Sequence, residues 1–314
     1  MYTPSYYIGP MTKNVVDAIL EFSEETGHKI GFIPSRRQVE FDGGYVNNWT
    51  TKQFAEYVDG RLPIKRDHGG PGQGFKDDDG FESLTEDCKY LDYIHIDPWK
   101  KYPKYEDGLD WTVKMINHCY ELNPNIQYEI GTEQSIREFT SNELHTLVSD
   151  LNVILDTNVF NQITHLVIQS GTSLKGNVNT GEYDSKRLNN MTEVATHWGM
   201  VSKEHNGDYI PVELIKEKFS LGLDSINIAP EFGLIETISY IESGIDINKF
   251  WKICYDSKRW VKWVDDNFDP MTQKEDLIKI CGHYVLSHTD FISIKPNIDS
   301  IIKENIKKKL HELH

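Results

Sequence analysis

Two short motifs combine residue types that could bind a metal ion and transfer protons. In the stretch IKRDHGGPGQG, Asp67 stands beside His68 and a glycine-rich segment follows. In EHNGDY, His205 stands three residues before Asp208. Two histidines with nearby carboxylates can hold Zn²⁺ or a similar ion and leave one position open for a substrate. A carboxylate beside such an ion can move protons on and off a substrate hydroxyl. A polar turn at the end of a strand is the alternative interpretation of each motif.

Polar or ionisable residues follow seven of the eight short apolar runs in the sequence. One such residue is typical of a strand that enters a loop. Seven of them would converge on one mouth if the runs were parallel strands of a barrel, where active sites lie at the carboxyl ends of the strands. The residues concerned are Gln38, Asp67, His68, His95, Asp97, Glu129, Glu133, Gln169, His205, Asp208 and Asn227.

The elements that must position these residues alternate along the chain. Each apolar run is followed by a stretch with helical spacing of apolar residues, such as TKNVVDAILEFSEETG after the first run. Strands separated by helices run parallel, and eight of them can close a cylinder. We therefore expect an α/β protein, a TIM (β/α)8 barrel over residues 1–245. The expected strands are 6–9, 29–35, 62–68, 93–97, 126–131, 164–171, 199–205 and 224–229.

The pattern changes to an aromatic, helical tail after residue 245. We expect residues 246–314 to form a C-terminal helical extension packed on the barrel. Trp251, Trp260 and Trp263 are then expected in the core or at an interface, and the closing stretch IIKENIKKKL is expected to be a solvated helix. Two other histidines are not expected to act as ligands. His95 lies inside an apolar run, and His165 begins one, at the opposite end of the barrel.

Glycine-rich loops and neighbouring cations could contact a phosphate group. The segments GGPGQG (69–74) and GTSLKGN (171–177) allow close approach of the backbone and offer amide groups to anions. Lys175, Arg36 and Arg37 could add positive charge.

Composition excludes several classes of function. The chain has 314 residues and a formal net charge of −16, from 49 acidic residues against 33 Lys and Arg. This surplus repels nucleic acid and anionic membranes. No apolar run is long enough for a membrane helix, and the beginning, MYTPSYYIGP, lacks the regions of a signal peptide. The four cysteines are widely spaced without a CxxC pair, so we expect reduced thiols and a cytoplasmic location.

With these residues in view, the chain resembles the family of the non-catalytic subunit of class II D-tagatose-1,6-bisphosphate aldolase. That family is itself similar to the zinc-dependent class II ketose-bisphosphate aldolases, and its members look like TIM barrels. The matching landmarks keep their order from residue 36 to residue 233. They are RRQVEFDGGY, TTKQFAEYV, RDHGGPG, IHID, EIGTE, VIQSG, EHNGDY and INIAPEFG.

The resemblance implies roles for individual residues. The acid of the Asp–His pair, here Asp67, acts in proton transfer at the substrate hydroxyl, and the histidines matching His68 and His205 hold the metal. Glu129 matches a ligand of some members, and Glu133 fits the GTE motif of the subunit family. The chain departs from the aldolases in GTSLKGN, which lacks their further histidine, so either Glu133 or Asp208 completes the metal site or the site is absent.

The candidate site can be stated in full. We expect a divalent metal ion, zinc in the first place, with manganese and cobalt as alternatives. Asp67, Asp97 and Glu133 are the catalytic candidates, and the ligand candidates are His68, Glu129, Glu133 and His205. The candidates for substrate binding are Gln38, Gln169, Gly171, Lys175, Asp208 and Asn227.

Two hypotheses of function follow from the resemblance. In the first, the protein is a metal-dependent class II aldolase-like enzyme that cleaves, condenses or epimerises a ketose or ketose phosphate. In the second, it is a non-catalytic partner subunit that stabilises or activates a class II tagatose-bisphosphate aldolase. The expected partners are the sugar itself and either a catalytic aldolase subunit or a second copy of the chain.

Overall fold

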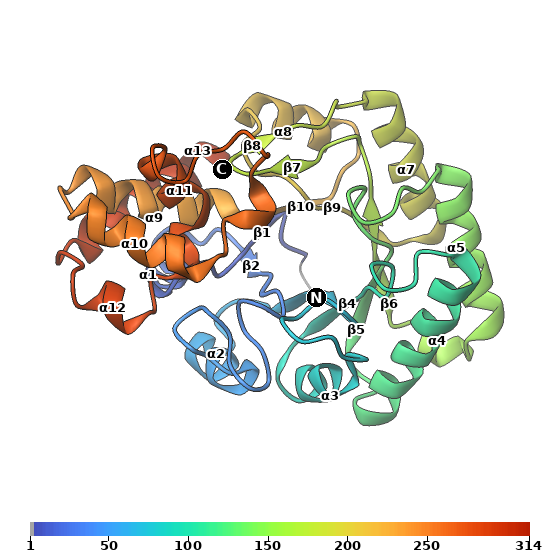
Figure 1. Cartoon of the computed structure of the whole chain (residues 1–314). Coiled ribbons are helices and arrows are strands. Elements are labelled where there is room, and N and C mark those ends of the chain that lie inside the picture. The colour runs from blue at the N-terminus through green and yellow to red at the C-terminus, as the bar shows by residue number, and fades with distance from the viewer. Residues whose placement is uncertain (1–2) are drawn as a thin grey trace.

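Eight parallel strands form a barrel whose order around the axis is β2-β1-β10-β9-β6-β5-β4-β3 (Figure 1). The computed structural model describes residues 3–314, so Met1 and Tyr2 of the expected barrel lie outside the described part. Parallel bridges from Phe32 to Ile64 and from Ser35 to Asp67 join the two ends of the sheet. The strands are β1 (Tyr6–Ile8), β2 (Ile30–Phe32), β3 (Lys65–Gly69), β4 (Tyr93–Ile96), β5 (Gln127–Ile130), β6 (Ile163–Ile168), β9 (Val201–Glu204) and β10 (Ser225–Ile228). The expected barrel is confirmed.

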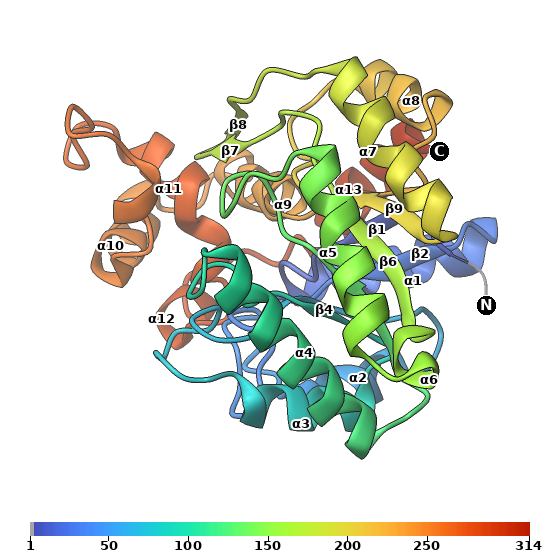
Figure 2. The same cartoon turned by 90° about the vertical axis from the view of Figure 1, so that its right-hand side faces the viewer.

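A helix follows each barrel strand and covers the outside of the cylinder (Figures 1 and 2). The first shows why these segments fold as expected: Thr12 accepts the N–H of Val15 as its N-cap, Gly27 ends the helix at a φ of 74°, and the apolar face is buried. The helices are α1 (Lys13–Thr26), α2 (Thr51–Val58), α3 (Phe81–Tyr90), α4 (Tyr105–Leu122), α5 (Ser141–Ile154), α7 (Ser185–Trp198), α8 (Val212–Ser220) and α9 (Pro230–Glu242).

Two small elements were not expected from the sequence. A short helix, α6 (Thr157–Phe160), precedes β6, and the loop after β6 contains a hairpin of β7 (Leu174–Lys175) and β8 (Val178–Asn179). The hairpin strands have two residues each, too short for a hydrophobic period to be visible in the sequence.

The C-terminal elements pack in two places. α10 (Ile247–Ser257), η1 (Val261–Trp263), α11 (Lys274–Cys281), η2 (Gly282–Tyr284) and α12 (Thr289–Ile292) cover the end of the barrel that also carries the hairpin (Figure 2). The last helix, α13 (Asp299–Leu313), lies against α1 and α9 instead.

The packing of α13 corrects the expectation of a solvated helix. Its apolar face, including Ile302, Ile306 and Leu310, is buried. Lysines on its flank pair with α1, where Lys307 Nζ lies 2.7 Å from a Glu25 carboxylate oxygen. The many lysines of the sequence concealed this apolar stripe, because long charged side chains can cover the edges of a buried face.

Among the described residues, none of the helices has both the length and the apolar character needed to cross a bilayer. All four cysteines are buried and free of disulfides.

Candidate active site

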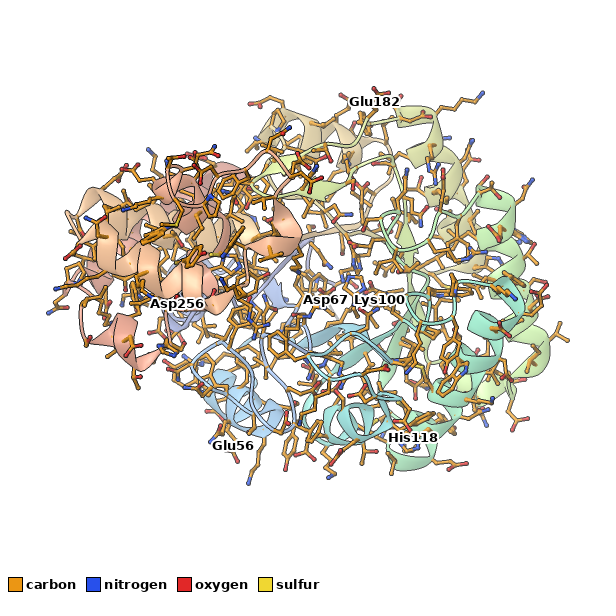
Figure 3. All side chains as sticks on the ribbon, in the orientation of Figure 1. Glu56, Asp67, Lys100, His118, Glu182 and Asp256 are labelled. Atoms are coloured by element: carbon orange, nitrogen blue, oxygen red, sulfur yellow. The ribbon has the colours of Figure 1, made fainter. Side chains whose placement is uncertain are left out.

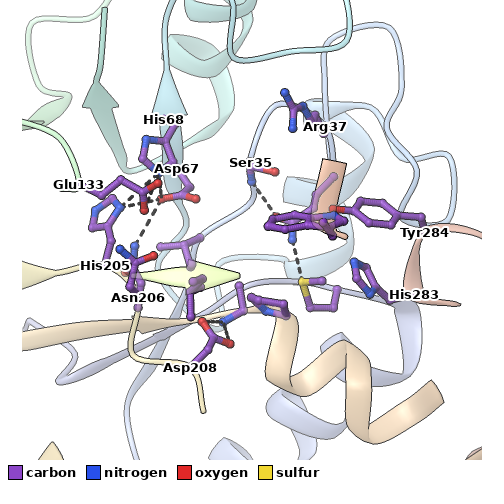
Figure 4. Close-up of a pocket in the computed structure, with 18 of the residues that line it drawn as sticks. Ser35, Arg37, Asp67, His68, Glu133, His205, Asn206, Asp208, His283 and Tyr284 are labelled. Carbon is purple, nitrogen blue, oxygen red and sulfur yellow. Dashed lines mark hydrogen bonds and ion pairs between the residues drawn. The ribbon is translucent and has the colours of Figure 1, made fainter. Parts of the chain in front are cut away.

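A cavity of about 310 Å³ opens at the carboxyl ends of the barrel strands. Asp67, which lines it, lies near the middle of the ring of strands and helices in Figure 3. Figure 4 shows two sides of this cavity, with Asp67, His68, Glu133 and His205 on one of them. The opposite side is built by the loop after β2 and by η1, α11 and η2 of the C-terminal extension.

The backbone of β3 turns His68 toward the cavity. The register with β4 shifts between Arg66 and Gly69, and His68 has a φ of 48°, in the left-handed region that non-glycine residues rarely adopt. Such strain concentrates at functional sites. Gly69 and Gly70 follow because there is no room for larger residues, since a Cβ at Gly69 would lie 2.8 Å from the carbonyl oxygen of His95. The glycines of this motif thus serve the close packing of β3 on β4.

His95 holds this turn in place. The backbone N–H of His68 donates to His95 Nδ1 at 3.2 Å, and His95 Nε2–H donates to the carbonyl of Gly131 at 2.9 Å. Burial lowers the pKa of His95 to about 4, so the imidazole is neutral. Its nitrogen is close enough to the atoms of Asp67, His68 and His205 to belong to one potential metal cluster. Because both nitrogens already have backbone partners, we assign His95 a positioning role, in agreement with the sequence interpretation.

Asp97 lies behind His68. The Nδ1–H of His68 donates to a carboxylate oxygen of Asp97 at 2.6 Å, and Thr132 and Gln73 donate to the same oxygen at 3.1 Å each. Burial raises the pKa of Asp97, but the hydrogen bond and charge of His68 outweigh burial and hold it below its ordinary value. Asp97 is fully buried, so it orients His68 rather than facing the cavity.

Glu129 has the same relation to His205. His205 Nε2–H donates to Glu129 at 2.8 Å, and the buried ammonium groups of Lys65 and Lys203 lie 2.7 and 3.0 Å from the same carboxylate. Burial would raise the pKa of Glu129, but Lys203 and Lys65 hold it well below its ordinary value. To bind a metal ion, Glu129 would have to give up its contacts with His205, Lys65 and Lys203. Glu129 therefore lies behind His205 and does not face the cavity.

The free nitrogens of the two histidines face each other across the site. His68 Nε2 lies 3.3 Å from His205 Nδ1. Asp67 Oδ1 is 3.6 Å from His205 Nδ1 and 3.9 Å from His68 Nε2, and Glu133 Oε2 is also 3.9 Å from His68 Nε2. Two nitrogens bound to a tetrahedral zinc ion at ~2.05 Å are about 3.3 Å apart. Each imidazole also donates its other N–H to a buried carboxylate, the usual support of a metal-binding histidine. The donor set fits a divalent ion.

Without an ion, a proton takes this position. Burial lowers the pKa of His68, but the carboxylates of Asp67, Asp97 and Glu133 together raise it to about 10. The protonated Nε2 of His68 can then donate to Nδ1 of His205. The facing nitrogens therefore share a positive charge in either case.

Three of the expected substrate-binding residues line the cavity. Asn227 donates to Asp67 Oδ1 at 3.3 Å, while its own side-chain oxygen is buried and has no hydrogen-bond partner in the described part of the chain. Gln38 accepts the N–H of Ser35 at 2.8 Å. Asp208 accepts the N–H groups of Ala229 and Glu231 at the beginning of α9, at 2.9 and 2.8 Å.

The other three lie away from the cavity. Gln169 joins loops through hydrogen bonds to Phe139, Thr132 and Arg137. Gly171 packs against the carbonyl of Glu182. The exposed Lys175 pairs with Asp265, while its hairpin neighbours Leu174, Gly176 and Asn177 line the cavity instead.

Sequence reasoning missed the contribution of the C-terminal extension. Trp263, Ile280, His283 and Tyr284 line the cavity, and Nδ1 of the buried His283 has no hydrogen-bond partner among residues 3–314. Their positions follow from the packing of the extension over the barrel mouth, and no local sequence motif predicts this packing. The aromatic character of the tail was the single available signal.

No family model matches this sequence, and no curated protein matches it. Solved structures match its fold. A probable tagatose 6 phosphate kinase from Sinorhizobium meliloti 1021 has a TM-score of 0.76 at 15% identity, over 99% of both chains. The YdjI aldolase from Escherichia coli K12 has a TM-score of 0.57 at 12% identity, over 99% of this chain and 91% of that one. The fructuronate-tagaturonate epimerase UxaE from Cohnella laeviribosi has a TM-score of 0.61 at 10% identity, over 100% and 79%. The chain thus has the barrel fold that sugar aldolases and a sugar epimerase also have.

Proposed function

We propose that this protein is a metal-dependent enzyme of the class II aldolase type, acting on a ketose or ketose phosphate by aldol and retro-aldol chemistry. The observation that carries the proposal is the pair of facing nitrogens of His68 and His205, 3.3 Å apart and each backed by a buried carboxylate. His68 and His205 would hold the ion, with the carboxylates of Asp67 and Glu133 beside it. When bound, the ion supplies positive charge that polarises a substrate carbonyl and stabilises negative charge on neighbouring oxygens.

Asp67 is the proposed base. Asn227 Nδ2 donates to its Oδ1, which keeps this carboxylate oriented beside the two histidines. The carboxylate accepts the proton of a substrate hydroxyl. The bond then breaks between the carbon that carries this hydroxyl and the carbon next to the ketose carbonyl, and its electron pair passes to the carbon next to the carbonyl. An aldehyde and an enediolate result. Reversal of these steps makes the bond again.

Glu133 is the proposed partner acid. It lies beside His68, so it can supply the proton that converts the enediolate carbon into a released ketone. If the aldehyde rotates before the bond re-forms, the same groups invert the configuration at the carbon that carries the hydroxyl. No proton from Glu133 is then needed. Cleavage, condensation and epimerisation therefore require the same base but differ in their need for Glu133.

The comparisons support the enzyme hypothesis through fold alone, since aldolases and an epimerase share this barrel. One observation favours the alternative of a partner subunit. The loop after β6, residues 169–184, contains no histidine, whereas the resemblance to the class II aldolases implies a further histidine ligand there.

The test begins with the isolated chain. The purified protein is stripped with chelator, reloaded with Zn²⁺, Mn²⁺ or Co²⁺, and assayed for cleavage and epimerisation of ketoses and ketose phosphates. We expect metal-dependent turnover that His68→Ala and Asp67→Asn abolish, while His197→Ala, an exposed histidine on α7, retains it. Inert protein that becomes functional only together with a class II aldolase would support the subunit hypothesis instead.

A further inference from the structure

Four cations cluster around Arg37, which lines the cavity. Arg37, on the loop after β2, lines the cavity, and Figure 4 shows it with Tyr284 and His283 opposite His68 and His205. Arg259 and Lys262 come from the extension, before and within η1. Lys100 follows β4. We call Arg37, Lys100, Arg259 and Lys262 the mouth cations.

The mouth cations lie close to one another. The guanidinium carbons of Arg37 and Arg259 are 5.9 and 3.8 Å from the centroid of the same ring, that of Phe75. Surrounding protein atoms, followed by the charges of Arg37, Lys100 and Arg259, lower the pKa of Lys262 to about 7. The pKa of Lys100 is also lowered, first by burial and then by Arg37. Like charges thus repel each other here.

The mouth cations form no direct ion pair among the described residues, although the charge of Glu133 acts on Lys262 and that of Asp97 acts on Lys100. Within residues 3–314, none of the mouth cations has a carboxylate oxygen within 4.0 Å. The side chain of Arg37 reaches the carbonyl of Gly74 at 3.4 Å, and Lys100 reaches that of Gly72 at 2.8 Å. The adjacent Arg36 differs sharply, because it is paired with both Glu40 and Asp78. The chain has a net charge of −16, so a cluster of cations without direct ion pairs beside a cavity stands out, and a bound anion would stabilise it.

The usual place for an anion in this fold is already filled. Many such barrels bind phosphate with the loops after strands seven and eight and a helix N-terminus. Here Asp208, after the seventh barrel strand, accepts the N–H groups of Ala229 and Glu231 at the beginning of α9. A phosphate group placed there would displace the carboxyl of Asp208 and face that of Glu231. An anionic group therefore needs another site.

We infer that the mouth cations bind the anionic end of the substrate, a phosphate or carboxylate group, while its ketose end lies at His68 and His205. The identity of the sugar rests on the proposed function, whereas the anion site rests on the arrangement of charges alone. Arg37 and Arg259 supply planar donors suited to either anion.

Inorganic phosphate tests the anion site independently of any sugar. Its affinity is measured by calorimetry at low ionic strength for the wild type, for R259Q/K262Q, and for K216Q/K308Q, which removes the same charge from exposed positions elsewhere. We expect binding at least roughly tenfold weaker in R259Q/K262Q, as for the loss of charged hydrogen bonds, and unchanged in the control. Equal affinity in all three proteins, or no binding to the wild type, would overturn the inference. Circular dichroism verifies that each variant is folded.

A second arm identifies the anion. The Zn²⁺-loaded protein is titrated with a ketohexose, its 6-phosphate and the corresponding keto-hexuronate. Preference for the phosphate identifies a sugar phosphate, and preference for the uronate identifies a carboxylate; R259Q/K262Q should lose either preference and keep its bound metal. A neutral ketose bound as tightly as both anions would contradict the inference. Phosphate binding without binding of any sugar would leave the anion site standing and count against the proposed function.

Discussion

His68 and His205 are 137 residues apart in the sequence, yet Nε2 of the first lies 3.3 Å from Nδ1 of the second. Each imidazole gives its other N–H to a buried carboxylate, Asp97 for His68 and Glu129 for His205. These buried carboxylates, which do not line the cavity, therefore fix the tautomer of each imidazole. The two remaining nitrogens are directed to a common point. The predictions below follow from this arrangement.

Metal binding should release a proton near neutral pH. Burial opposes the charged form of His68, but Asp67, Asp97 and Glu133 raise its pKa to about 10, so Nε2 carries a proton that an ion must displace. The apparent affinity for Zn²⁺ should therefore rise with pH between about 6.5 and 10. Calorimetry in buffers of different ionisation enthalpy measures the number of protons released. An affinity independent of pH across this range would contradict the assignment of His68 as a ligand.

Asp97→Asn should weaken metal binding while leaving the fold intact. The amide of this variant would no longer offer a negative oxygen to His68 Nδ1–H, and loss of such support typically costs about 10–100-fold in metal affinity. Competition with a chromophoric chelator measures the affinity for Zn²⁺. Asp110→Asn on the exposed face of α4, where the acid pairs only with Lys114, is the matched control and should match the wild type.

Glu129→Gln should destabilise the protein strongly. The change removes the charge shared by Lys65 and Lys203 in the barrel interior and leaves two fully buried ammonium groups without it. Breaking a buried ion pair in this way costs about 3–5 kcal/mol in the free energy of unfolding. Urea denaturation gives the value. In contrast, Glu138→Gln breaks an exposed pair with Arg187 and should change the free energy by less than about 1 kcal/mol.

Asp208→Asn should flatten the dependence of stability on pH. Burial raises the pKa of Asp208 to about 8, with Glu231 opposing ionisation and the N–H groups of Glu231 and Ala229 favouring it. The folded state then holds a proton that the unfolded chain, with an ordinary aspartate pKa, has lost. The contribution of this group is present below about pH 4 and is lost as the pH rises to about 8. Thermal unfolding from pH 5 to 9 should show a smaller decline in the variant. An identical decline in both proteins would mean that Asp208 is ionised in the fold.

The sequence was sufficient for the barrel because its signal is local and repeated. Eight apolar runs with helical stretches between them leave few other arrangements, and the rule that parallel strands share one carboxyl end brought His68 and His205 to one place. The finer geometry was not available in this way. Glu129 was expected to be a ligand because it matches a ligand of some class II aldolases, whereas its side chain pairs with Lys65 and Lys203 in the barrel interior.

The ion pairs of Glu129 could have been predicted from the sequence. Lys65, Glu129 and Lys203 each lie within an expected strand, and buried charges of opposite sign must pair with each other. The role of the extension could not be predicted, since the contacts of Trp263 and His283 with the cavity depend on how α10 to η2 dock on the barrel. Lys175 pairs with Asp265 of the same extension, so the orientation of the Lys175 side chain could not be predicted from the sequence either.

The backbone N–H of His68 bonds to the ring of His95, which in turn bonds to the carbonyl of Gly131, so a single imidazole joins β3, β4 and the end of β5. The imidazole of His68, a proposed metal ligand, is therefore fixed by three neighbouring strands. Ion exchange should proceed without rearrangement of the chain, and the emptied protein should keep its shape, unlike small zinc domains that unfold when the metal is removed.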